Sequence, residues 1–511
     1  MNDAHTPILV GSGQFTQHEP DPLKALSPID MTAVAAQKAL DDTEAGAKLK
    51  DQIDTLVILR SFSDTSWRFT SPFGRCTNAP KSVAARLNAT AVKRPIYTFA
   101  GGNMPQWSVN RLFEKITRGE VGAALIAGGE SLSTQKAAQR AGIQLDWNED
   151  PGGTPENWGV ETRGWSDVED RHKMMGAIYA YPLFENSLRK QQGHTIAEHL
   201  LAVGKLFEHF ADVAAKNPLA DRRAGYKAAE IAEVSQANPY IGFPYTKLMN
   251  SNAFIDQSAA IVLTSVAKAK ELGIPESKWV YLHGCADAYD HWYISDRKNY
   301  HSSPAMNVVG RETFEMANMS IDDMDYFDLY SCFPSAVQIA CQEQGLATDD
   351  PRGLTVTGGL PYFGGPGNNY VTHSIAEMMN QVRAKPGSKG LVTANGNYVT
   401  KQSAGIYSTD ATVRPFAPKD AKTYQAPILA DKGPATTEHA SGTAKIETYT
   451  VIHDRKGPSY AILFGRLEDG TRFIANTPED AGLLKDMTER DYMDAKGKVS
   501  SKDGLNIFSP D

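Results

Sequence analysis

Cysteine is scarce in this sequence, which has only four among 511 residues: Cys76, Cys285, Cys332 and Cys341. Cysteines so few and so widely spaced exclude a fold held together by disulfide bonds, and no Cys-x-x-Cys pair suggests a zinc site. We therefore expect a reduced protein without a bound metal.

Basic clusters and long apolar runs are also missing. The 52 Lys and Arg residues are outnumbered by 60 Asp and Glu, for a formal net charge of -8. No block of Lys and Arg gives the electrostatic footprint of a nucleic-acid-binding protein, and no run of about 18 apolar residues exists to span a membrane. Residues Met1–His5 lack the basic-then-apolar pattern of a signal peptide. These absences predict a cytoplasmic protein that binds no nucleic acid and has no membrane span.

The chain does contain enough apolar residues for large cores, since 41% of it is hydrophobic and 22% charged. Short, almost continuous apolar strands alternate with helical patterns, which predicts an α/β fold with a mostly parallel sheet covered on both faces. The expected strands are 7–13, 53–59, 97–100, 123–130, 259–263, 280–284 and 390–396, and the expected helices are 28–40 and 103–116.

The second expected helix follows a glycine pair, Gly101-Gly102. Asn103 is a suitable N-cap and Pro105 fits the first turn. Residues at helical spacing form its apolar face: Val109, Leu112, Phe113 and Ile116.

Changes in amino-acid composition and pattern divide the rest of the chain. Residues 131–246 are predicted to form an insertion that is helical from 194 to 215. Strands 321–329 and 390–396 echo 53–59 and 123–130, which suggests a duplicated α/β unit, with chance similarity as the alternative. After a polar linker, strands 445–452 and 460–467 and an Asp469-Gly470 hairpin turn predict a small β-barrel. We expect boundaries at 1–265, 266–416 and 417–511.

Five segments together resemble the thiolase superfamily, in the family's order and at fitting distances across about 5–415. Each match is too short to indicate the family by itself, and only the five matches together do so. They are Ala127–Ser131, Asn252–Ala260, Asp328–Phe333, the Gly358-Gly359 and Gly364–Pro366 loop, and Ala394–Gly396.

The chain most resembles thiolase-like proteins of type 1, which combine a sterol-carrier-type thiolase core with an additional C-terminal domain. The resemblance implies a duplicated αβαβα thiolase fold with an inserted loop domain at about 131–246 and a C-terminal barrel of oligonucleotide-binding (OB) type. It also implies coenzyme A (CoA) or an acyl-CoA as substrate or ligand, a role in lipid metabolism and no covalently bound cofactor. A homodimer is typical of thiolase cores, whereas a fused barrel that covers the pairing surface would leave a monomer.

The family's catalytic pattern is incomplete here. The position of its nucleophilic cysteine falls on Gly102, or on Asn103 if the alignment slips by one, and the Gly-His-Pro histidine position falls on Gly365. Ala394 replaces the last cysteine, next to Asn395, which we also place in the site. Neither Gly102 nor Asn103 can form an acyl thioester.

Only Cys332 matches an acid/base cysteine of the family. It precedes an expected helix at 333–340, and a helix N-terminus favours the thiolate. A buried structural cysteine is the alternative, and we expect the other three cysteines to be structural.

Tyr330 stands where the family has a His or Asn of the oxyanion hole, and a phenol can donate a hydrogen bond to a thioester or enolate oxygen. Thiolase-like steroid side-chain aldolases resemble this arrangement, so cleavage of a β-hydroxyacyl-CoA is an alternative activity. Tyr398 is a candidate second phenol. Packing is the alternative role for both tyrosines.

Backbone N–H groups at Gly102, Asn103 and Gly365 could form an oxyanion hole, with ordinary tight turns as the alternative. His373 could replace the lost loop histidine, although we expect a surface or capping residue. The family resemblance places CoA phosphates near the basic residues of the insertion, with a solvated helix face as the alternative reading of these residues. They are Arg222, Arg223 and Lys227.

Three hypotheses for the function follow. The first is an acyl-CoA-handling protein, nominally an acetyl-CoA acetyltransferase, whose classical thiolase activity is weak or absent. The second is a carbon–carbon lyase acting on a β-hydroxyacyl-CoA. The third is a non-catalytic module that binds CoA or an acyl thioester.

Overall fold

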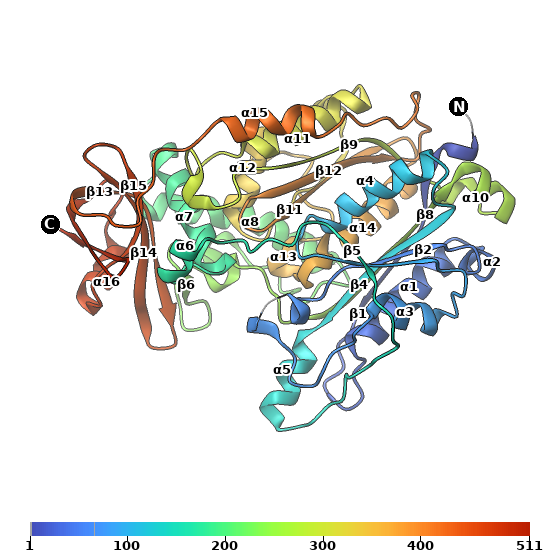
Figure 1. Cartoon of the computed structure of the whole chain (residues 1–511), viewed down its shortest axis with the longest axis horizontal. Helices are drawn as coiled ribbons and strands as arrows, with labels where there is room; N and C mark the ends of the chain where they lie inside the picture. Colours follow the sequence, from blue (N-terminus) through green and yellow to red (C-terminus); the bar gives the residue numbers. More distant parts are fainter. Residues whose placement is uncertain (1–2, 66) are drawn as a thin grey trace.

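The computed structural model describes residues 3–65 and 67–511, and its first sheet has six strands (Figure 1). The central strands are buried on both faces, as the apolar runs predicted. In spatial order the strands are β1 (Pro7–Thr16), β8 (Asp256–Ser265), β4 (Ala123–Ser131), β2 (Thr55–Ile58), β3 (Arg94–Thr98) and β5 (Glu156–Trp158).

The second sheet repeats this order on a smaller scale, as β9 (Tyr281–Tyr289), β12 (Lys401–Ser408), β11 (Lys389–Gly396) and β10 (Tyr326–Asp328). In both sheets the first three strands run antiparallel to their neighbours, and the fourth strand runs parallel to the third. The duplication is therefore confirmed. The expectation of a mostly parallel sheet is wrong for the second sheet, because β12 returns from β11 through a short hairpin and must run antiparallel to it.

Helices α4 (Met104–Thr117) and α14 (Tyr370–Ala384) lie between the two sheets, and both are largely buried. A helix covered on both sides must be apolar or internally paired around most of its surface. Helices α1 (Pro28–Asp42) and α3 (Ala79–Leu87) cover the outer face of the first sheet (Figure 1). Helix α11 (Pro304–Ala317) covers the second sheet, and α12 (Pro334–Gln344) packs against α11. The result is the layered αβαβα arrangement of the thiolase fold.

The inserted segment contains the predicted long helix, α8 (Ile196–Lys216). It starts with a capping box, in which the Thr195 side chain accepts from the Glu198 N–H and the Glu198 side chain accepts from the Thr195 N–H. The other elements are α5 (Leu132–Ala141), α6 (Asp167–Arg171), α7 (Ala177–Gln192), α9 (Ala228–Ala232), β6 (Tyr240–Gly242) and β7 (Tyr245–Thr246).

Smaller helices complete the core. They are α2 (Gly46–Lys50), α10 (Val266–Leu272) and α13 (Gly359–Tyr362), and α15 (Lys422–Ala430) lies in the linker that leads to the C-terminal strands.

The last five strands close into a barrel, because β13 pairs with both β14 and β16 while β15 joins β14 to β17. The predicted turn at Asp469-Gly470 is confirmed, and Gly470 has the positive φ of +87° that such a turn needs. The elements are β13 (Gly442–Asp454), β14 (Gly457–Leu467), β15 (Arg472–Asn476), α16 (Ala481–Glu489), β16 (Lys496–Lys502) and β17 (Leu505–Pro510).

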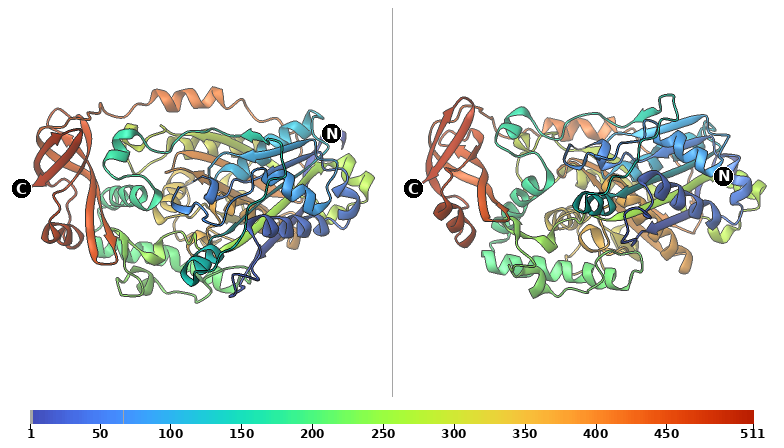
Figure 2. Two further views of the ribbon diagram at one scale, coloured as in Figure 1. Left: turned by 60° about the horizontal axis from the view of Figure 1, so that its bottom comes forward. Right: turned by 90° about the horizontal axis from the view of Figure 1, so that it is seen from below.

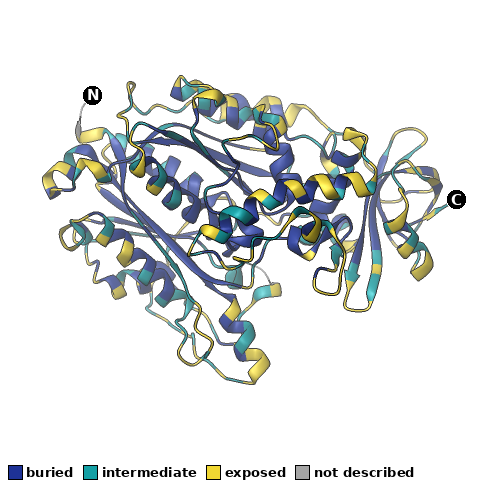
Figure 3. Cartoon of the chain, turned by 180° about the vertical axis from the view of Figure 1, so that it is seen from behind, coloured by how far each residue is buried: buried dark blue, intermediate teal, exposed yellow. Residues whose placement is uncertain are grey.

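The barrel lies at one end of the molecule (Figure 2) and is attached to the insertion. Strand β6 extends the sheet at β13 through the pair Gly242 and Ile452. The Thr448 hydroxyl donates to the Leu183 carbonyl at 2.6 Å, so β13 also binds helix α7. Buried residues run through both sheets, and the barrel has a core of its own (Figure 3).

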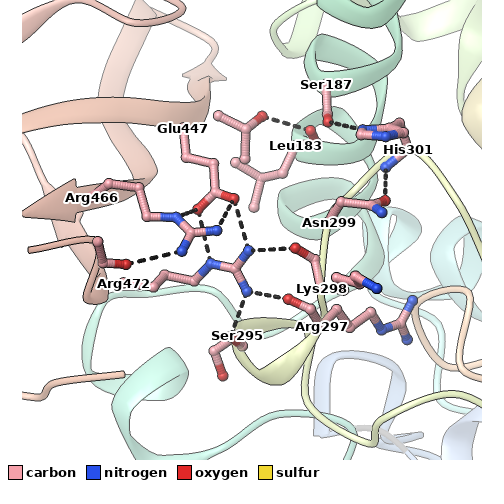
Figure 4. Close-up of polar contacts among 12 residues, drawn as sticks. Leu183, Ser187, Ser295, Arg297, Lys298, Asn299, His301, Glu447, Arg466 and Arg472 are labelled. Carbon is pink, nitrogen blue, oxygen red and sulfur yellow. Dashed lines mark hydrogen bonds and ion pairs between the residues drawn. The ribbon is translucent and has the colours of Figure 1, made fainter. Parts of the chain in front are cut away.

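A buried arginine forms a second attachment (Figure 4). The Arg472 guanidinium, fully buried, donates to Glu447 at 2.7 and 2.8 Å, and Glu447 also accepts from Arg466 within the barrel. An arginine fork can bridge several acceptors at fixed angles, which a lysine cannot do. The same guanidinium donates to three carbonyls of the core, those of Ser295, Arg297 and Lys298.

No helix in the described part of the chain is long and apolar enough to cross a membrane.

Candidate active site

The five matched segments converge in space at the ends of β4, β10 and β11. The Gly365 N–H donates to the Asn252 carbonyl at 2.9 Å, and the Ser251 N–H donates to the Cys332 carbonyl at 3.1 Å. Two asparagines of the glycine-rich loop bind other segments: Asn368 accepts from the Gly101 N–H at 2.9 Å, and Asn369 donates to the Gly128 carbonyl at 2.6 Å.

Gly102 and Tyr330 meet at the centre of this cluster. A Cβ atom at position 102 would lie 2.2 Å from the Tyr330 Oη and 2.5 Å from the Asn395 carbonyl oxygen. The Tyr330 hydroxyl makes no hydrogen bond with any described protein atom, and burial raises the pKa of Tyr330 well above its usual value. The phenol is therefore a neutral donor, available to an oxygen of a ligand.

Cys332 lies directly before α12, as predicted, but its thiol is not acidified. Burial raises the pKa of Cys332 to about 12, although the neighbouring Tyr181 hydroxyl lowers it in part. The expected stabilisation of the thiolate is wrong, because desolvation of the buried sulfur outweighs the partial charge of the helix N-terminus.

Tyr181 is a site residue that the sequence did not reveal. It comes from α7, and its hydroxyl donates to the Asn397 carbonyl at 3.0 Å and accepts from Asn395 Nδ2 at 2.9 Å. Its ring stacks on Phe333 at 4.4 Å between centroids. Asn395 Nδ2 also lies 4.0 Å from the Cys332 sulfur, so Asn395 lies beside both Tyr181 and Cys332. Nothing in the sequence of the insertion indicated which of its aromatic residues would turn inward.

The predicted second phenol, Tyr398, packs beside this group with its ring edge-on to Tyr181, 6.4 Å between centroids. Burial raises the pKa of Tyr398. Arg297 donates to the Tyr398 carbonyl and to the Thr400 hydroxyl, both at 2.8 Å. Because Arg472 binds the carbonyl of Arg297, the barrel is linked to the hairpin that carries Tyr398.

The glycine loop differs from expectation. The Gly365 N–H is already bonded to Asn252, so it is not free to bind an oxyanion. A Cβ at Gly365 would lie 2.3 Å from the Ser251 Oγ, so Ser251 fills the space that a side chain at position 365 would need. Asn103 precedes α4 as predicted, yet its side chain makes no capping bond.

The expected exposure of His373 is wrong. The residue lies on α14 between the sheets, fully buried, with its Nδ1 2.8 Å from Gln14 Oε1. Burial lowers the pKa of His373 to about 3, so the ring is neutral. A helix enclosed on both sides leaves even its polar residues inside.

Two further ionisable groups border the site. Lys401 Nζ donates to the Ala100 carbonyl and would lie 2.6 Å from a Cβ at Gly101. Lys401 makes no ion pair with a described residue, and burial lowers its pKa to about 8. Glu130 Oε1 accepts from the Phe62 N–H at 2.7 Å, and burial raises the pKa of Glu130 to about 8. Their sequence contexts gave no sign of this burial.

The basic residues expected to bind CoA do not form one cluster. Arg222 donates to the Pro361 carbonyl at 3.0 Å, and Lys227 forms ion pairs with Glu208 at 3.1 Å and Asp212 at 3.2 Å. Arg223 is exposed and forms no ion pair with any residue that the structure describes. Neighbours in sequence thus face different partners.

The site is compact. A cavity of about 20 Å³, large enough for about one water molecule, is lined by Tyr330, Asn395, Thr393 and Gln402 among others. Within residues 3–65 and 67–511, no three His, Cys, Asp or Glu side chains are grouped so as to hold a metal ion.

Comparison with known proteins supports the same architecture. A family model described as "Thiolase-like protein type 1 additional C-terminal domain" matches residues 424–504. The crystal structure of a monomeric SCP2-thiolase-like protein type 1 from Mycobacterium smegmatis is 35% identical, covers 99% of this chain and 100% of its own, and superposes with a TM-score of 0.84.

More distant relatives match the core. A 3-ketoacyl-CoA thiolase of Salmonella heidelberg (strain SL476) is 24% identical over 245 residues. The match covers 44% of this chain and 54% of that protein. The chain therefore spans about half the length of the curated relatives it matches. The Ltp2-ChsH2(DUF35) aldolase shares the fold at 17% identity, 80% of this chain and 99% of its own, with a TM-score of 0.57.

Proposed function

Since this chain belongs to the family of SCP2-thiolase-like proteins of type 1, we propose that it binds an acyl-CoA-type thioester at Gly102, Tyr330 and Cys332 without forming an acyl-enzyme. A thiolase needs a cysteine nucleophile activated by its surroundings. Here the corresponding position is a glycine, and a phenol occupies the adjacent space. Acetyl-CoA acetyltransferase activity, the first hypothesis from the sequence, would then be weak or absent.

The contact between Gly102 and Tyr330 carries this proposal. A neutral phenol with no protein partner is suited to donate to a thioester carbonyl. Cys332, the one remaining cysteine of the pattern, stays protonated at neutral pH because burial raises its pKa to about 12. It can donate a weak hydrogen bond, but it is a poor nucleophile.

Calorimetric titration with CoA, acetyl-CoA and a long-chain acyl-CoA tests the binding. We expect saturable binding of the thioesters, weakened roughly tenfold in Tyr330→Phe because one hydrogen bond to the ligand is lost. The Tyr326→Phe variant is the control, a phenol on β10 at the strand's half-buried start. Equal affinity of wild type and Tyr330→Phe would contradict the placement of the ligand.

A second candidate, cleavage of a β-hydroxyacyl-CoA, is favoured by Lys401. Lys401 Nζ lies beside Gly101, one residue from the contact between Gly102 and Tyr330. The neutral amine would accept the β-hydroxyl proton as the Cα–Cβ bond breaks and the β-carbon becomes a carbonyl. The electron pair of that bond moves to the thioester as an enolate, whose oxygen accepts from Tyr330 and whose Cα then takes the proton back.

Product analysis separates the candidates. Cleavage of a β-hydroxyacyl-CoA into an aldehyde or ketone and a shorter acyl-CoA, lost in both Lys401→Met and Tyr330→Phe, would support the lyase. Binding with no turnover of any thioester would indicate a non-catalytic binding module.

A further inference from the structure

Four cations on one face of this acidic protein have no counter-charge. Lys136, Arg140, Lys247 and Arg455 form no ion pair in the described part of the chain, and we call them the basic patch. The pKa of Lys136 is lowered by partial burial and then by three neighbouring cations, which are Arg140, Arg455 and Lys247. Like charges held together without ion pairs repel one another, so the arrangement costs stability unless an anion joins it.

Helix α5 supplies two members of the patch. Lys136 and Arg140 are four residues apart and therefore share one face of the helix. The start of α5 is tied to the site segment, because the Leu132 N–H donates to the Ile255 carbonyl at 3.1 Å. Lys136 Nζ lies 3.6 Å above the ring centroid of Phe254, which is 47% exposed.

Strand pairing brings the other two members together. Gly242 of β6 pairs antiparallel with Ile452 of β13, so the residues after Ile452 run alongside those before Gly242. Lys247 is held there by its N–H, which donates to the Pro239 carbonyl at 2.9 Å. Arg455 lies in the turn between β13 and β14, so the barrel contributes directly to the patch.

The patch is connected to the candidate site by a short stretch of chain. Phe254 is three residues from Ser251, whose N–H donates to the Cys332 carbonyl. Three residues span at most about 10 Å. An acyl-CoA has a thioester at one end of a flexible pantetheine arm and several phosphates at the other, and these two features match the site and the patch.

We propose that Lys136, Arg140, Lys247 and Arg455 bind the phosphates of the nucleotide end of a CoA-type ligand, with Arg455 supplied by the C-terminal barrel. This inference rests on the proposed function, and it replaces the cluster expected from sequence. Arginine and lysine bind phosphate through charge-assisted hydrogen bonds. Phe254 offers an exposed aromatic face against which an adenine ring could stack.

The test uses two ligands that separate the ends of CoA: adenosine 3′,5′-bisphosphate for the nucleotide end and an acetyl-pantetheine thioester for the other. Affinities are measured by calorimetry for wild type, Arg455→Gln and Lys136→Gln. Lys498→Gln is the control, an exposed barrel cation on β16, at the opposite end of β13.

We expect Arg455→Gln and Lys136→Gln each to weaken CoA and the bisphosphate roughly tenfold and to leave the pantetheine thioester unchanged, because only phosphate contacts are lost. Lys498→Gln should change neither. Unchanged CoA and bisphosphate affinities in both patch variants, or no binding of the bisphosphate to wild type, would overturn the proposal.

The failure of this inference differs from the failure of the proposed function. Binding of the pantetheine thioester without the bisphosphate would keep the site and refute the patch, and the reverse result would keep the patch and refute the site. Arg455-dependent binding to phosphatidylserine vesicles, without nucleotide binding, would assign the patch to a membrane surface and overturn the proposal.

Discussion

The Tyr330 hydroxyl lies 2.2 Å from where a Cβ atom at Gly102 would be. Side-chain atoms cannot share this space, so the tyrosine and any larger residue at position 102 exclude each other. The fold therefore has no room for a nucleophilic side chain at position 102 while Tyr330 keeps its place. Under the proposed function, the phenol offers a hydrogen bond there instead.

Gly102→Cys is the direct test of this exclusion. We expect the variant to be destabilised by roughly 1–3 kcal/mol through overpacking, and to gain no thiolase activity. Tyr330→Phe in the same chain removes the closest atom and should recover part of the loss. Urea denaturation of both single variants and the double variant measures the coupling. A Gly102→Cys protein as stable as wild type would show that the site has room.

The pH dependence of Cys332 alkylation tests its burial. Because burial raises the pKa of Cys332 from 9.0 to about 12, the neutral thiol is stabilised in the fold, and this contribution is lost as pH rises between these values. We expect iodoacetamide to modify Cys332 slowly at pH 8 and faster toward pH 11, as read by peptide mass mapping. A midpoint at or below 9 in the native protein would be inconsistent with a desolvated sulfur.

Lys401→Met should stabilise the protein near neutral pH. The lowered pKa of Lys401, about 8 against 10.5, means that the charged form is disfavoured in the fold by roughly 3 kcal/mol. This penalty is full below pH 8 and is relieved as pH rises to 10.5, where the unfolded lysine also loses its proton. Denaturation at pH 7 and pH 10 measures it. The gain should shrink at pH 10, and a variant less stable than wild type at pH 7 would refute the prediction.

Arg472→Met should damage the barrel–core interface more than Arg466→Met. Both side chains bind Glu447, but only Arg472, fully buried, also binds core carbonyls. Its removal leaves buried acceptors unpaired, and we expect a loss of roughly 3–5 kcal/mol in the free energy of unfolding. Arg466→Met is the matched control.

Hydrogen exchange of residues 395–401 would report whether the damage reaches the site through Arg297. Equal exchange of this hairpin in both arginine variants would show that the link to the site has no effect.

Local patterns predicted much of the fold. Apolar strands, the duplicated order and the Asp469-Gly470 turn depend on short-range sequence, and the structure has all three. The proximity of Tyr330 and Asn395 was also foreseeable, because their segments kept the family's order.

Long-range packing decided the rest. Tyr181 enters the site because α7 is held between the core and β13, and no local pattern encodes that contact. His373 is buried because a sheet covers each side of α14. The basic patch brings together residues of α5, a loop and a barrel turn. Its first and last members, Lys136 and Arg455, are more than 300 residues apart in the sequence.

The most direct test of the account is to add acetyl-CoA to the purified protein and to record binding heat and intact mass on the same sample. We predict saturable binding with no increase in mass, because the ligand meets Tyr330 rather than a reactive thiolate. A stable mass increase of one acetyl group that disappears in Cys332→Ser would contradict the account, since it would show that the chain still forms an acyl-enzyme.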